Sequence, residues 1–290
     1  MSGLNVLAPG PLATLQDLGR HGYAHLGVPA SGAADRGALA LANRLVGNEE
    51  SAAAIETTMG GLRVEAVGDL LVSVTGAQTT VRRNGVPAGL AAALVLRAGD
   101  ELVLDTPDRG LRNYVAVRGG IDVEPVLGSR ATDTLSGLGP DALSAGCVLP
   151  VGRAAGDWPP ASQAPPDTSH PSVTVLECHP GPREDHLRSS SDLYRGTWVV
   201  GADSNRVGVR LDRAADSGDP LLTHRDDVPE LRSEGIAHGS VQVPPSGRPV
   251  LFLADHPVTG GYPVAAVLTV GAVDLAAQLV PGSEIRFRRR

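Results

Sequence analysis

Short hydrophobic runs separated by turn residues dominate the chain. In the first half these runs cover residues 69–75, 81–83, 102–104 and 114–117, and in the second half they cover 173–176, 198–200, 207–211, 250–253 and 285–287. Short runs rich in Val, Leu and Ile, bounded by Gly, Pro, Asn and Asp, are typical of β-strands. The pattern therefore predicts an all-β protein, rich in strands and with a few short helices.

Two segments have helical spacing instead. Residues 35–46 place their apolar side chains on one stripe, and Gly47 follows as a helix stop. A second short helix is expected at residues 274–279. The pair Asn84-Gly85 lies between two strand-forming runs, and it is a strong signal for a two-residue β-hairpin turn.

Residues 154–172 are rich in Pro, Ser and Ala and have no hydrophobic periodicity. Such a segment is typical of a semi-rigid linker. We therefore expect an N-terminal lobe at residues 1–153, a linker at 154–172 and a C-terminal lobe at 173–290. Many short strands with Gly and Pro turns favour a barrel-like architecture for both lobes.

The chain contains no lysine, because all 25 of its Lys and Arg residues are arginine. A Walker-type phosphate loop and a Schiff-base enzyme both require a lysine amine. A Ser–Lys amidase and a biotin-carrier domain require one as well. Arginine does not replace lysine as a nucleophile, since its guanidinium stays protonated. The chain therefore carries no covalent biotin.

Charge and composition narrow the range of partners. The net charge of −7 and the 3% aromatic content argue against nucleic acid as a partner. The N-terminus lacks the pattern of a secretory signal, and the longest apolar run, residues 90–96, is too short to span a membrane. Cys147 and Cys178 lie in unrelated contexts, which fits a reducing compartment. We expect a cytoplasmic protein.

Polar side chains cluster among glycines in three places. Arginine suits carboxylate or phosphate groups, and backbone N–H groups in a Gly-rich loop suit a developing oxyanion. The same residues are also explained as structural groups, since Asp–Arg pairs and Asx turns hold irregular loops together. His21 and His25 stand four apart, but flanking glycines argue against a helix, so we expect no metal site. The candidates are Gln16, Asp17, Arg20, His21, Asp35 and Asn43 in the first cluster, Arg206 in the second, and Gln242, Asp255, Thr259, Gly260, Gly261 and Tyr262 in the third.

Taken in order, these motifs resemble the allophanate-hydrolase-subunit-2-like family, also called the biotin-dependent carboxyltransferase family, which includes the KipA-type proteins. The resemblance extends from Val6 to Phe287. Its matching pieces are residues 16–22 (QDLGRHG), 27–35 (GVPASGAAD), 42–48 (ANRLVGN), 119–121 (GGI), 128–129 (GS), 242–244 (QVP) and 259–263 (TGGYP), together with Glu56 and Asp255.

The resemblance implies a protein of two cyclophilin-like β-barrel lobes that works in complex with a smaller KipI-like subunit. It also implies a role, with a third subunit, in an ATP-dependent 5-oxoprolinase that hydrolyses 5-oxo-L-proline to L-glutamate. ATP would bind with Mg²⁺, either wholly on the partner or at a site that the partner shares with this chain. The small-molecule substrate is the cyclic amide.

On this resemblance Asp17, Arg20, Asp35, Asp255 and Tyr262 are the expected catalytic residues. The expected substrate-binding residues are Gln16, His21, Asn43, Arg206, Gln242, Thr259, Gly260 and Gly261. One departure stands out, because the family's usual Ser-Asp-Arg-Met-Gly is replaced here by residues 204–208 (SNRVG), which lack the carboxylate. Two alternatives stay open: a carboxyltransferase subunit of a biotin-dependent carboxylase, and a non-catalytic KipA-like antagonist of a KipI-type kinase inhibitor.

Overall fold

The computed structural model describes residues 2–154, 156–165, 171–214 and 217–290. The chain divides into two compact units. Unit 1 comprises Met1–Arg20, Ser31–Asp133 and Gly137–Thr168, and unit 2 comprises His21–Ala30, Thr134–Ser136 and Ser169–Arg290. Two short segments of the expected N-terminal lobe, residues 21–30 and 134–136, thus belong to unit 2.

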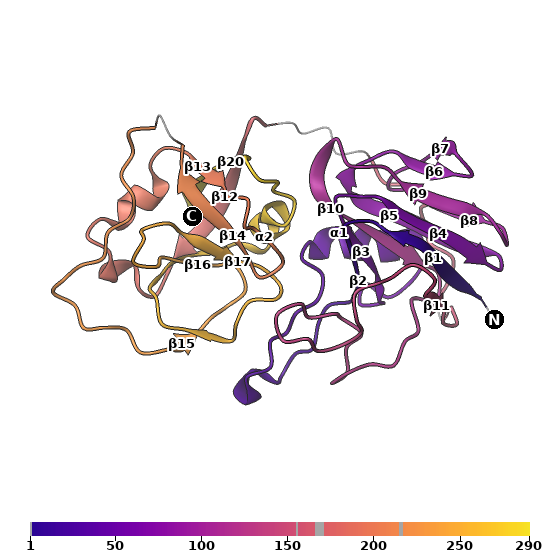
Figure 1. Cartoon of the computed structure of the whole chain (residues 1–290), viewed down its shortest axis with the longest axis horizontal. Coiled ribbons are helices and arrows are strands. Elements are labelled where there is room, and N and C mark those ends of the chain that lie inside the picture. The colour runs from indigo at the N-terminus through magenta and orange to yellow at the C-terminus, as the bar shows by residue number, and fades with distance from the viewer. Residues whose placement is uncertain (1, 155, 166–170, 215–216) are drawn as a thin grey trace. The chain divides into compact units, whose positions relative to one another are not determined.

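The strands of unit 1 form two antiparallel sheets (Figure 1). The six-stranded sheet has the order β11 (Val148–Pro150), β1 (Gly3–Pro9), β4 (Leu62–Val67), β9 (Glu101–Leu104), β6 (Val81–Arg83) and β7 (Val86–Ala88). The five-stranded sheet has the order β2 (Leu12–Gln16), β3 (Ala54–Thr58), β10 (Arg109–Val117), β5 (Leu70–Gln78) and β8 (Ala93–Leu96).

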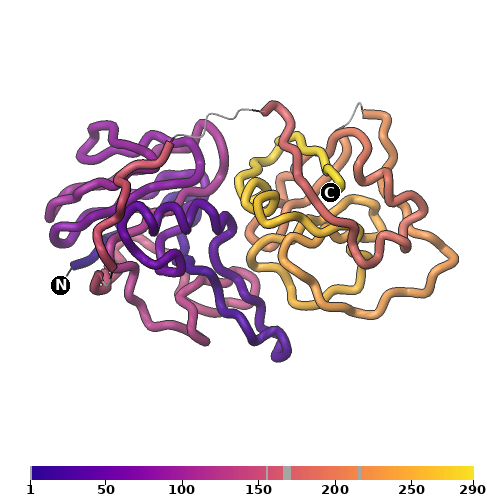
Figure 2. Tube along the Cα trace, turned by 180° about the vertical axis from the view of Figure 1, so that it is seen from behind, coloured from indigo at the N-terminus to yellow at the C-terminus, as the bar shows by residue number. Residues whose placement is uncertain are grey.

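Side-chain alternation on β10 explains how these sheets pack. Val115 and Val117 point into the core that both sheets share, whereas Tyr114 and Ala116 point to the opposite face. Successive residues of a strand face opposite sides, so one strand serves two layers. Helix α1 (Arg36–Leu45) covers that second face and lies across β5 and β10 (Figure 2). Its N-cap is Asp35, whose Oδ1 accepts from the Ala38 N–H at 2.8 Å.

Both local predictions for unit 1 are confirmed. The helix expected at residues 35–46 is α1, and it ends before Gly47, whose φ of 70° is left-handed. Asn84 (φ 49°) and Gly85 (φ 78°) connect β6 to β7. Two successive positive φ values fit a type I′ turn, which matches the twist of a hairpin.

The strands of unit 2 form a closed seven-stranded barrel, which confirms the expected all-β class and barrel architecture for this unit. Its order is β12 (Val173–Pro180), β19 (Val264–Leu268), β16 (Ser240–Gln242), β17 (Val250–Phe252), β14 (Gly208–Arg213), β13 (Trp198–Val200) and β20 (Glu284–Arg289). The parallel pair β12–β20 closes the ring. The fully buried Trp198 fills its core, and its Nε1 donates to the Leu193 carbonyl at 2.9 Å.

Unit 2 has a few further elements. They are the two-stranded sheet of β15 (Glu234–Gly235) and β18 (Thr259–Gly260), the 3₁₀ turns η1 (Ala24–Leu26), η2 (Glu184–His186) and η3 (Ser190–Tyr194), and helix α2 (Val270–Ala276). The prediction of a helix at 274–279 was wrong in both bounds, because α2 begins at Val270 and ends at Ala276. Thr269 begins the helix one turn earlier, because its hydroxyl accepts from the Ala272 N–H at 3.3 Å.

The predicted linker, residues 154–172, is partly outside the described residues, which lack 155 and 166–170. Residues 154 and 156–165 belong to unit 1, whereas residues 171 and 172 belong to unit 2. Gln163 forms a β-bridge with Ala92, and the Arg118 guanidinium lies over the Trp158 ring at 4.6 Å. The segment around Trp158 and Gln163 therefore belongs to the folded structure of unit 1.

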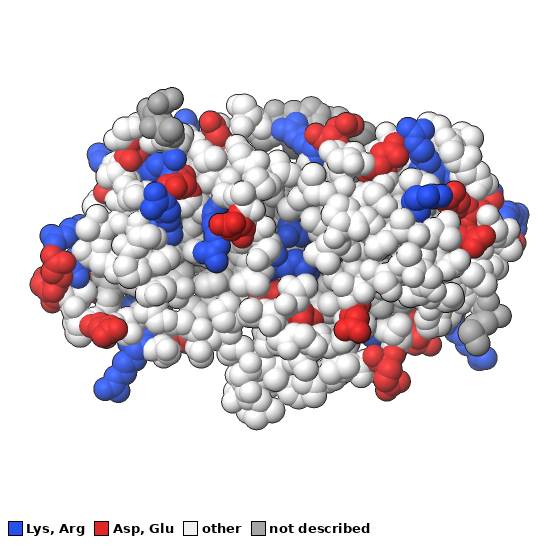
Figure 3. All heavy atoms as spheres, viewed as in Figure 1, with Lys and Arg blue, Asp and Glu red and all other residues white. Residues whose placement is uncertain are grey.

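Acidic and basic side chains are interspersed on the face shown in Figure 3. Neither of the two α-helices found in the described residues is long and apolar enough to cross a membrane.

Candidate functional site

Arg20 is a buried cation that lacks an acidic partner in the described part of unit 1. It follows β2 in a tight loop, and only 1% of its surface is exposed. Its Nη2 donates to the Ala131 carbonyl, while Nε and Nη1 are buried and have no hydrogen-bond partner. A buried charge without full compensation is costly. The guanidinium is therefore held ready for acceptors that a ligand can supply.

Gln16 completes this arrangement from the last position of β2. Its Nε2 donates to the Thr132 carbonyl at 2.9 Å and to Thr14 Oγ1 at 3.0 Å. Its Oε1 is buried without a partner, as is Thr132 Oγ1. The Ala131 carbonyl thus accepts from the end of the Arg20 side chain, and the next carbonyl, that of Thr132, accepts from the end of the Gln16 side chain. We call these four residues the Arg20 cradle.

Asp17 holds the loop that carries Arg20. Its Oδ1 accepts from the Gly19 N–H and from Ser129 Oγ, both at 2.7 Å, and its Oδ2 accepts from the Arg130 N–H at 2.6 Å. These bonds tie the loop after β2 to the segment that supplies the cradle carbonyls. All three bonds are to groups of the protein, so Asp17 positions this loop; a catalytic role for it stays a prediction.

Asp35 and Asn43 serve helix α1. Asp35 caps the helix, and its backbone N–H donates to the Tyr114 hydroxyl at 2.8 Å. Asn43 Nδ2 donates to the carbonyls of Glu50 and Ala52 and so fastens the chain after the helix. These hydrogen bonds give both residues a structural role; the catalytic role expected for Asp35 and the substrate-binding role expected for Asn43 stay predictions.

A buried network lies beneath α1. The Tyr114 hydroxyl donates to Glu56 Oε2 at 2.7 Å, and the same oxygen accepts from the Ala34 N–H at 3.0 Å. Burial, reinforced by the Glu56 charge, raises the pKa of Tyr114 well above its usual value. Tyr114 therefore acts as a neutral hydrogen-bonding group.

Arg206 and Asp255 form a buried ion pair in unit 2. Arg206 Nε donates to Asp255 Oδ2 at 2.9 Å, and Nη2 donates to Oδ1 at 3.0 Å. Thr134 adds donations from its N–H (3.0 Å) and its hydroxyl (2.7 Å) to Oδ2. Both charged groups are thereby satisfied, so the pair fastens residues 134–136 to the barrel.

The missing carboxylate at position 205 has a structural explanation. Asn205 Oδ1 accepts from the N–H groups of Val207 at 2.8 Å and Gly208 at 3.3 Å. This is an Asx turn, and an amide oxygen serves it as well as a carboxylate oxygen does. The substitution therefore preserves the turn that leads into Arg206 and β14.

The loop at residues 259–263 borders a pocket of about 470 Å³ in unit 2, lined by Ala24, His25, Gly27, Pro29, Leu135, Ser136, Pro257, Val258 and Thr259. Gln242 Nε2 donates to the Tyr262 carbonyl at 3.0 Å. A Cβ on Gly260 would lie 2.7 Å from this Nε2, so a larger residue there would displace the Gln242 amide. The Tyr262 side chain is half-exposed, and Gly261 and His21 are exposed.

The structure therefore gathers the candidates into separate groups. Gln16, Asp17 and Arg20 lie together in unit 1, and Arg206 lies with Asp255 in unit 2. Gln242 and Gly260 form the third group, with Tyr262 and Thr259. Of these groups, the Arg20 cradle has the unsatisfied donors and acceptors that a bound ligand would complete.

Sequence reasoning missed the residues that face Arg20 from across the cradle. Ala131 and Thr132 act through backbone carbonyls, and Gly139 allows close approach, because a Cβ there would lie 2.9 Å from Arg20 Nη2. These residues follow Arg20 by more than a hundred positions and carry no local chemical signal. No group of three or more His, Cys, Asp or Glu in the described ranges is placed to hold a metal ion.

Comparisons with known proteins give the family. Residues 26–289 match the sequence profile of the carboxyltransferase domain, subdomain A and B. A 5-oxoprolinase subunit from Escherichia coli (strain K12) is 37% identical over 98% of this chain and 90% of its own length. A 5-oxoprolinase subunit from Haemophilus influenzae is 33% identical over 95% of this chain and 87% of its own length.

A solved structure supports the same conclusion. The urea carboxylase of Kluyveromyces lactis superposes with a TM-score of 0.88 at 28% identity, over 98% of this chain. This chain spans 27% of that chain, about a quarter of it. Both the profile and the full-length relatives confirm the resemblance seen in the motifs: the chain belongs to the carboxyltransferase domain family, subdomain A and B.

Proposed function

We propose that the chain is a subunit of an ATP-dependent 5-oxoprolinase that hydrolyses 5-oxo-L-proline to L-glutamate in the cytoplasm. It acts with a KipI-like subunit and a third subunit. One observation carries the proposal: a buried guanidinium with unsatisfied N–H groups, in a chain 37% identical to a 5-oxoprolinase subunit along nearly its whole length.

The hydrogen-bonding groups of the Arg20 cradle complement those of 5-oxoproline. Nε and Nη1 lie on different edges of the planar guanidinium, so they suit two separate acceptors. The substrate offers two, its carboxylate and its ring carbonyl. Gln16 Oε1 is an acceptor in need of a donor, and the ring N–H of the substrate provides one. The cradle thus supplies a partner for each polar group of a cyclic amide acid.

Entry of the substrate requires movement, because the cradle atoms are buried. The adjacent turn packs on Arg20 and contains Gly137 (φ 70°) and Gly139 (φ 89°). The Asp133 backbone closes this turn, because its carbonyl accepts from the Gly137 N–H at 3.0 Å and its N–H donates to the Leu138 carbonyl at 2.9 Å. Glycines lower the cost of backbone rearrangement, so residues 137–139 are the part of this turn that we expect to move, while Thr134 stays hydrogen-bonded to Asp255.

Arg20 also has a role in the chemistry that follows binding. An amide resists hydrolysis until its oxygen is activated, and ATP supplies the phosphoryl group for that activation. A guanidinium that remains charged stabilises negative charge developing on the carbonyl oxygen. The chain has no lysine for a Walker-type loop, so any nucleotide site on it uses other groups.

A second candidate function is a carboxyltransferase subunit of a biotin-dependent carboxylase. The match to the K. lactis urea carboxylase structure, with a TM-score of 0.88, favours it. Since the chain has no lysine, biotin would have to arrive on a separate carrier protein.

Reconstitution separates these functions. The chain is co-expressed with its KipI-like neighbour and the third subunit, and ADP release is measured with and without 5-oxoproline. The proposal predicts ADP release that depends on 5-oxoproline and yields glutamate. An assembled complex that releases no substrate-dependent ADP contradicts it, and carboxyl transfer from a biotinylated carrier would favour the second candidate.

A further inference from the structure

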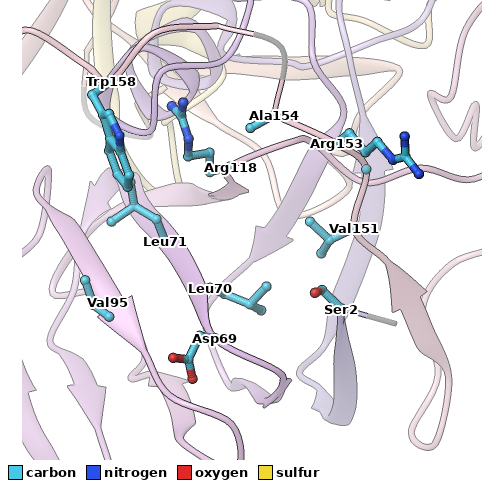
Figure 4. A pocket seen from close by; sticks show the side chains of 11 residues that line it. Ser2, Asp69, Leu70, Leu71, Val95, Arg118, Val151, Arg153, Ala154 and Trp158 are labelled. Atoms are coloured by element: carbon cyan, nitrogen blue, oxygen red, sulfur yellow. The ribbon is translucent and has the colours of Figure 1, made fainter.

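A second pocket, of about 460 Å³, lies in unit 1 and shares no residue with the Arg20 cradle (Figure 4). Its volume is within the range of small-molecule sites. Most of its lining is apolar, and the rest is Ser2, one acidic and two basic side chains. The lining residues are Ser2, Asp69, Leu70, Leu71, Val95, Arg118, Val151, Gly152, Arg153, Ala154 and Trp158.

Trp158 presents an aromatic face that is both exposed and fixed. The residue is 73% exposed, yet the Arg118 guanidinium lies 4.6 Å from its ring centroid. Arg118 Nη2 donates to the Gly156 carbonyl at 2.6 Å, and Nη1 donates to the Asp157 carbonyl at 3.0 Å. Arg118 therefore holds the backbone just before Trp158 as well as its ring.

The other anchor of this segment is the chain after α1. Arg118 Nη1 also donates to the Val46 carbonyl at 2.9 Å. Gly47 is next, and a Cβ there would lie 2.6 Å from the Asp157 carbonyl oxygen and would overlap Arg118. The glycine permits this close packing. Holding a large aromatic in place before binding lowers the entropic cost of stacking a ligand on it.

The charges around the pocket favour an anion. Asp69 already accepts from Arg97 Nη1 at 2.6 Å and from the Ala98 N–H at 3.1 Å. The Arg97 hydrogen bond lowers the pKa of Asp69, which keeps this carboxylate ionised and paired. Arg153 is exposed and has no carboxylate partner in the described part of the chain. It lies across the pocket from Trp158 in Figure 4. The unneutralised charge is therefore positive.

We propose that this pocket binds a planar heteroaromatic ring that carries an anionic group, as a nucleotide does. The ring stacks on Trp158 and contacts Leu70, Leu71 and Val95, while the phosphate meets Arg153. This site extends the proposed ATP-dependent function by giving the nucleotide a place on this chain. Its test requires no turnover, so a failure here leaves the proposed reaction standing.

The two tryptophans make the test direct. Trp198 is fully buried, with the Arg213 guanidinium 3.5 Å from its ring centroid, whereas Trp158 is exposed. Long-wavelength emission and quenching by iodide therefore report on Trp158. The isolated full-length chain is titrated with ATP, ADP, adenosine and inorganic pyrophosphate, each with and without Mg²⁺, and calorimetry measures the same affinities.

The proposal predicts that ATP, ADP and adenosine quench the long-wavelength emission. ATP should bind about tenfold more tightly than adenosine, because Arg153 contributes a charge-assisted contact. Arg153→Ala should remove that advantage, and Trp158→Ala should weaken all three ligands. Trp158→Phe, followed by calorimetry, should retain most of the affinity. Arg210→Ala, which removes an exposed arginine of unit 2, is the control and should bind as the wild type does.

Three results overturn the proposal. One is the absence of binding at millimolar nucleotide, and another is equal affinity in the wild type, Arg153→Ala and Trp158→Ala. The third is protection of Trp158 from iodide by the KipI-like subunit while nucleotides have no effect, which would make the pocket a protein-docking site instead.

Discussion

Arg206 and Asp255 pair inside unit 2 through two parallel hydrogen bonds of 2.9 and 3.0 Å. Asp255 is 0% exposed and Arg206 is 2% exposed. Removing one member of such a pair leaves a buried charge without a partner. The relationship therefore marks Asp255 as a group on which folding depends.

Asp255→Ala should accordingly lower the free energy of unfolding by about 3–5 kcal/mol. Urea denaturation followed by circular dichroism measures this. The matched control is Asp227→Ala, which breaks an exposed Arg–Asp pair in the same unit and should leave the urea midpoint nearly unchanged. An Asp255→Ala protein of normal stability that has lost activity would restore a catalytic role to this residue.

Gly139 and Gly137 provide a second test, because they lie in one turn and differ in their surroundings. Both have left-handed φ, but a Cβ on Gly139 would overlap the Ala131 carbonyl, whereas a Cβ on Gly137 meets nothing within 4 Å. Gly137→Ala should lower the free energy of unfolding by about 1 kcal/mol, from backbone strain alone. Gly139→Ala should lower it further. It should also raise the KM for 5-oxoproline, because it displaces the Ala131 carbonyl that accepts a hydrogen bond from Arg20. Thermal unfolding and steady-state kinetics of the reconstituted complex measure both effects, and equal behaviour of the two variants would contradict the role of the Ala131 carbonyl.

Gln16→Glu should place a carboxylate in the Arg20 cradle that neutralises the charge of Arg20. Gln16 and Arg20 donate to consecutive carbonyls, those of Thr132 and Ala131, so we expect the new carboxylate to compete with the substrate for the unsatisfied nitrogens of Arg20. We expect the KM for 5-oxoproline to rise at least about tenfold, which corresponds to roughly 1.4 kcal/mol of binding. Gln163→Glu, at an exposed position of unit 1, is the control and should leave the KM unchanged. An unaltered KM in Gln16→Glu would remove Gln16 from the substrate site.

Cys178 should make the stability of unit 2 depend on alkaline pH. Burial is the main cause that raises the pKa of its thiol from 9.0 to about 11, and burial likewise raises the pKa of Tyr194 to about 12. The folded protein keeps protons that the unfolded chain releases. This stabilisation is therefore complete below pH 9 and is lost as the pH rises toward 11 and beyond.

Urea denaturation between pH 7 and pH 11 measures the effect. The free energy of unfolding should fall above pH 9, and Cys178→Ala should remove about 1–2 kcal/mol of that fall. Only the pH dependence is compared, so a constant loss caused by the smaller side chain does not matter. Parallel profiles of the wild type and Cys178→Ala would contradict the assigned pKa.

Local features of the fold could be predicted from the sequence. Strand alternation, the Asn84-Gly85 turn and the stripe of α1 are set by neighbouring residues, and each lies where it was expected. The start of α2 was missed because Thr269 competes with later residues as the N-cap, and a cap depends on one hydrogen bond. The assignment of residues 21–30 and 134–136 to unit 2 depends on contacts between distant segments, which no local pattern contains.

The candidate site shows the same limit. Composition and spacing placed Gln16, Asp17 and Arg20 in one predicted cluster. They did not show which of the three residues binds a ligand and which one positions the loop. The hydrogen bonds distinguish the roles of these residues. The carboxylate oxygens of Asp17 accept from three protein donors, whereas two nitrogens of Arg20 have no acceptor. Similarly, Asp35 and Asp255 look alike in sequence to a catalytic acid, and only their partners show that they act as a helix cap and an ion-pair member.

We infer that Arg20 stays buried and uncompensated because its function is to bind the substrate. Arg20→Met tests it most directly, since methionine fills similar space without a charge. Urea denaturation and the 5-oxoproline dependence of ADP release by the reconstituted complex are measured on the same preparation. If Arg20 binds the substrate, the free energy of unfolding is unchanged or higher in this variant, while substrate-dependent ADP release is lost. A variant that unfolds more easily, or one that retains the wild-type KM, would contradict it.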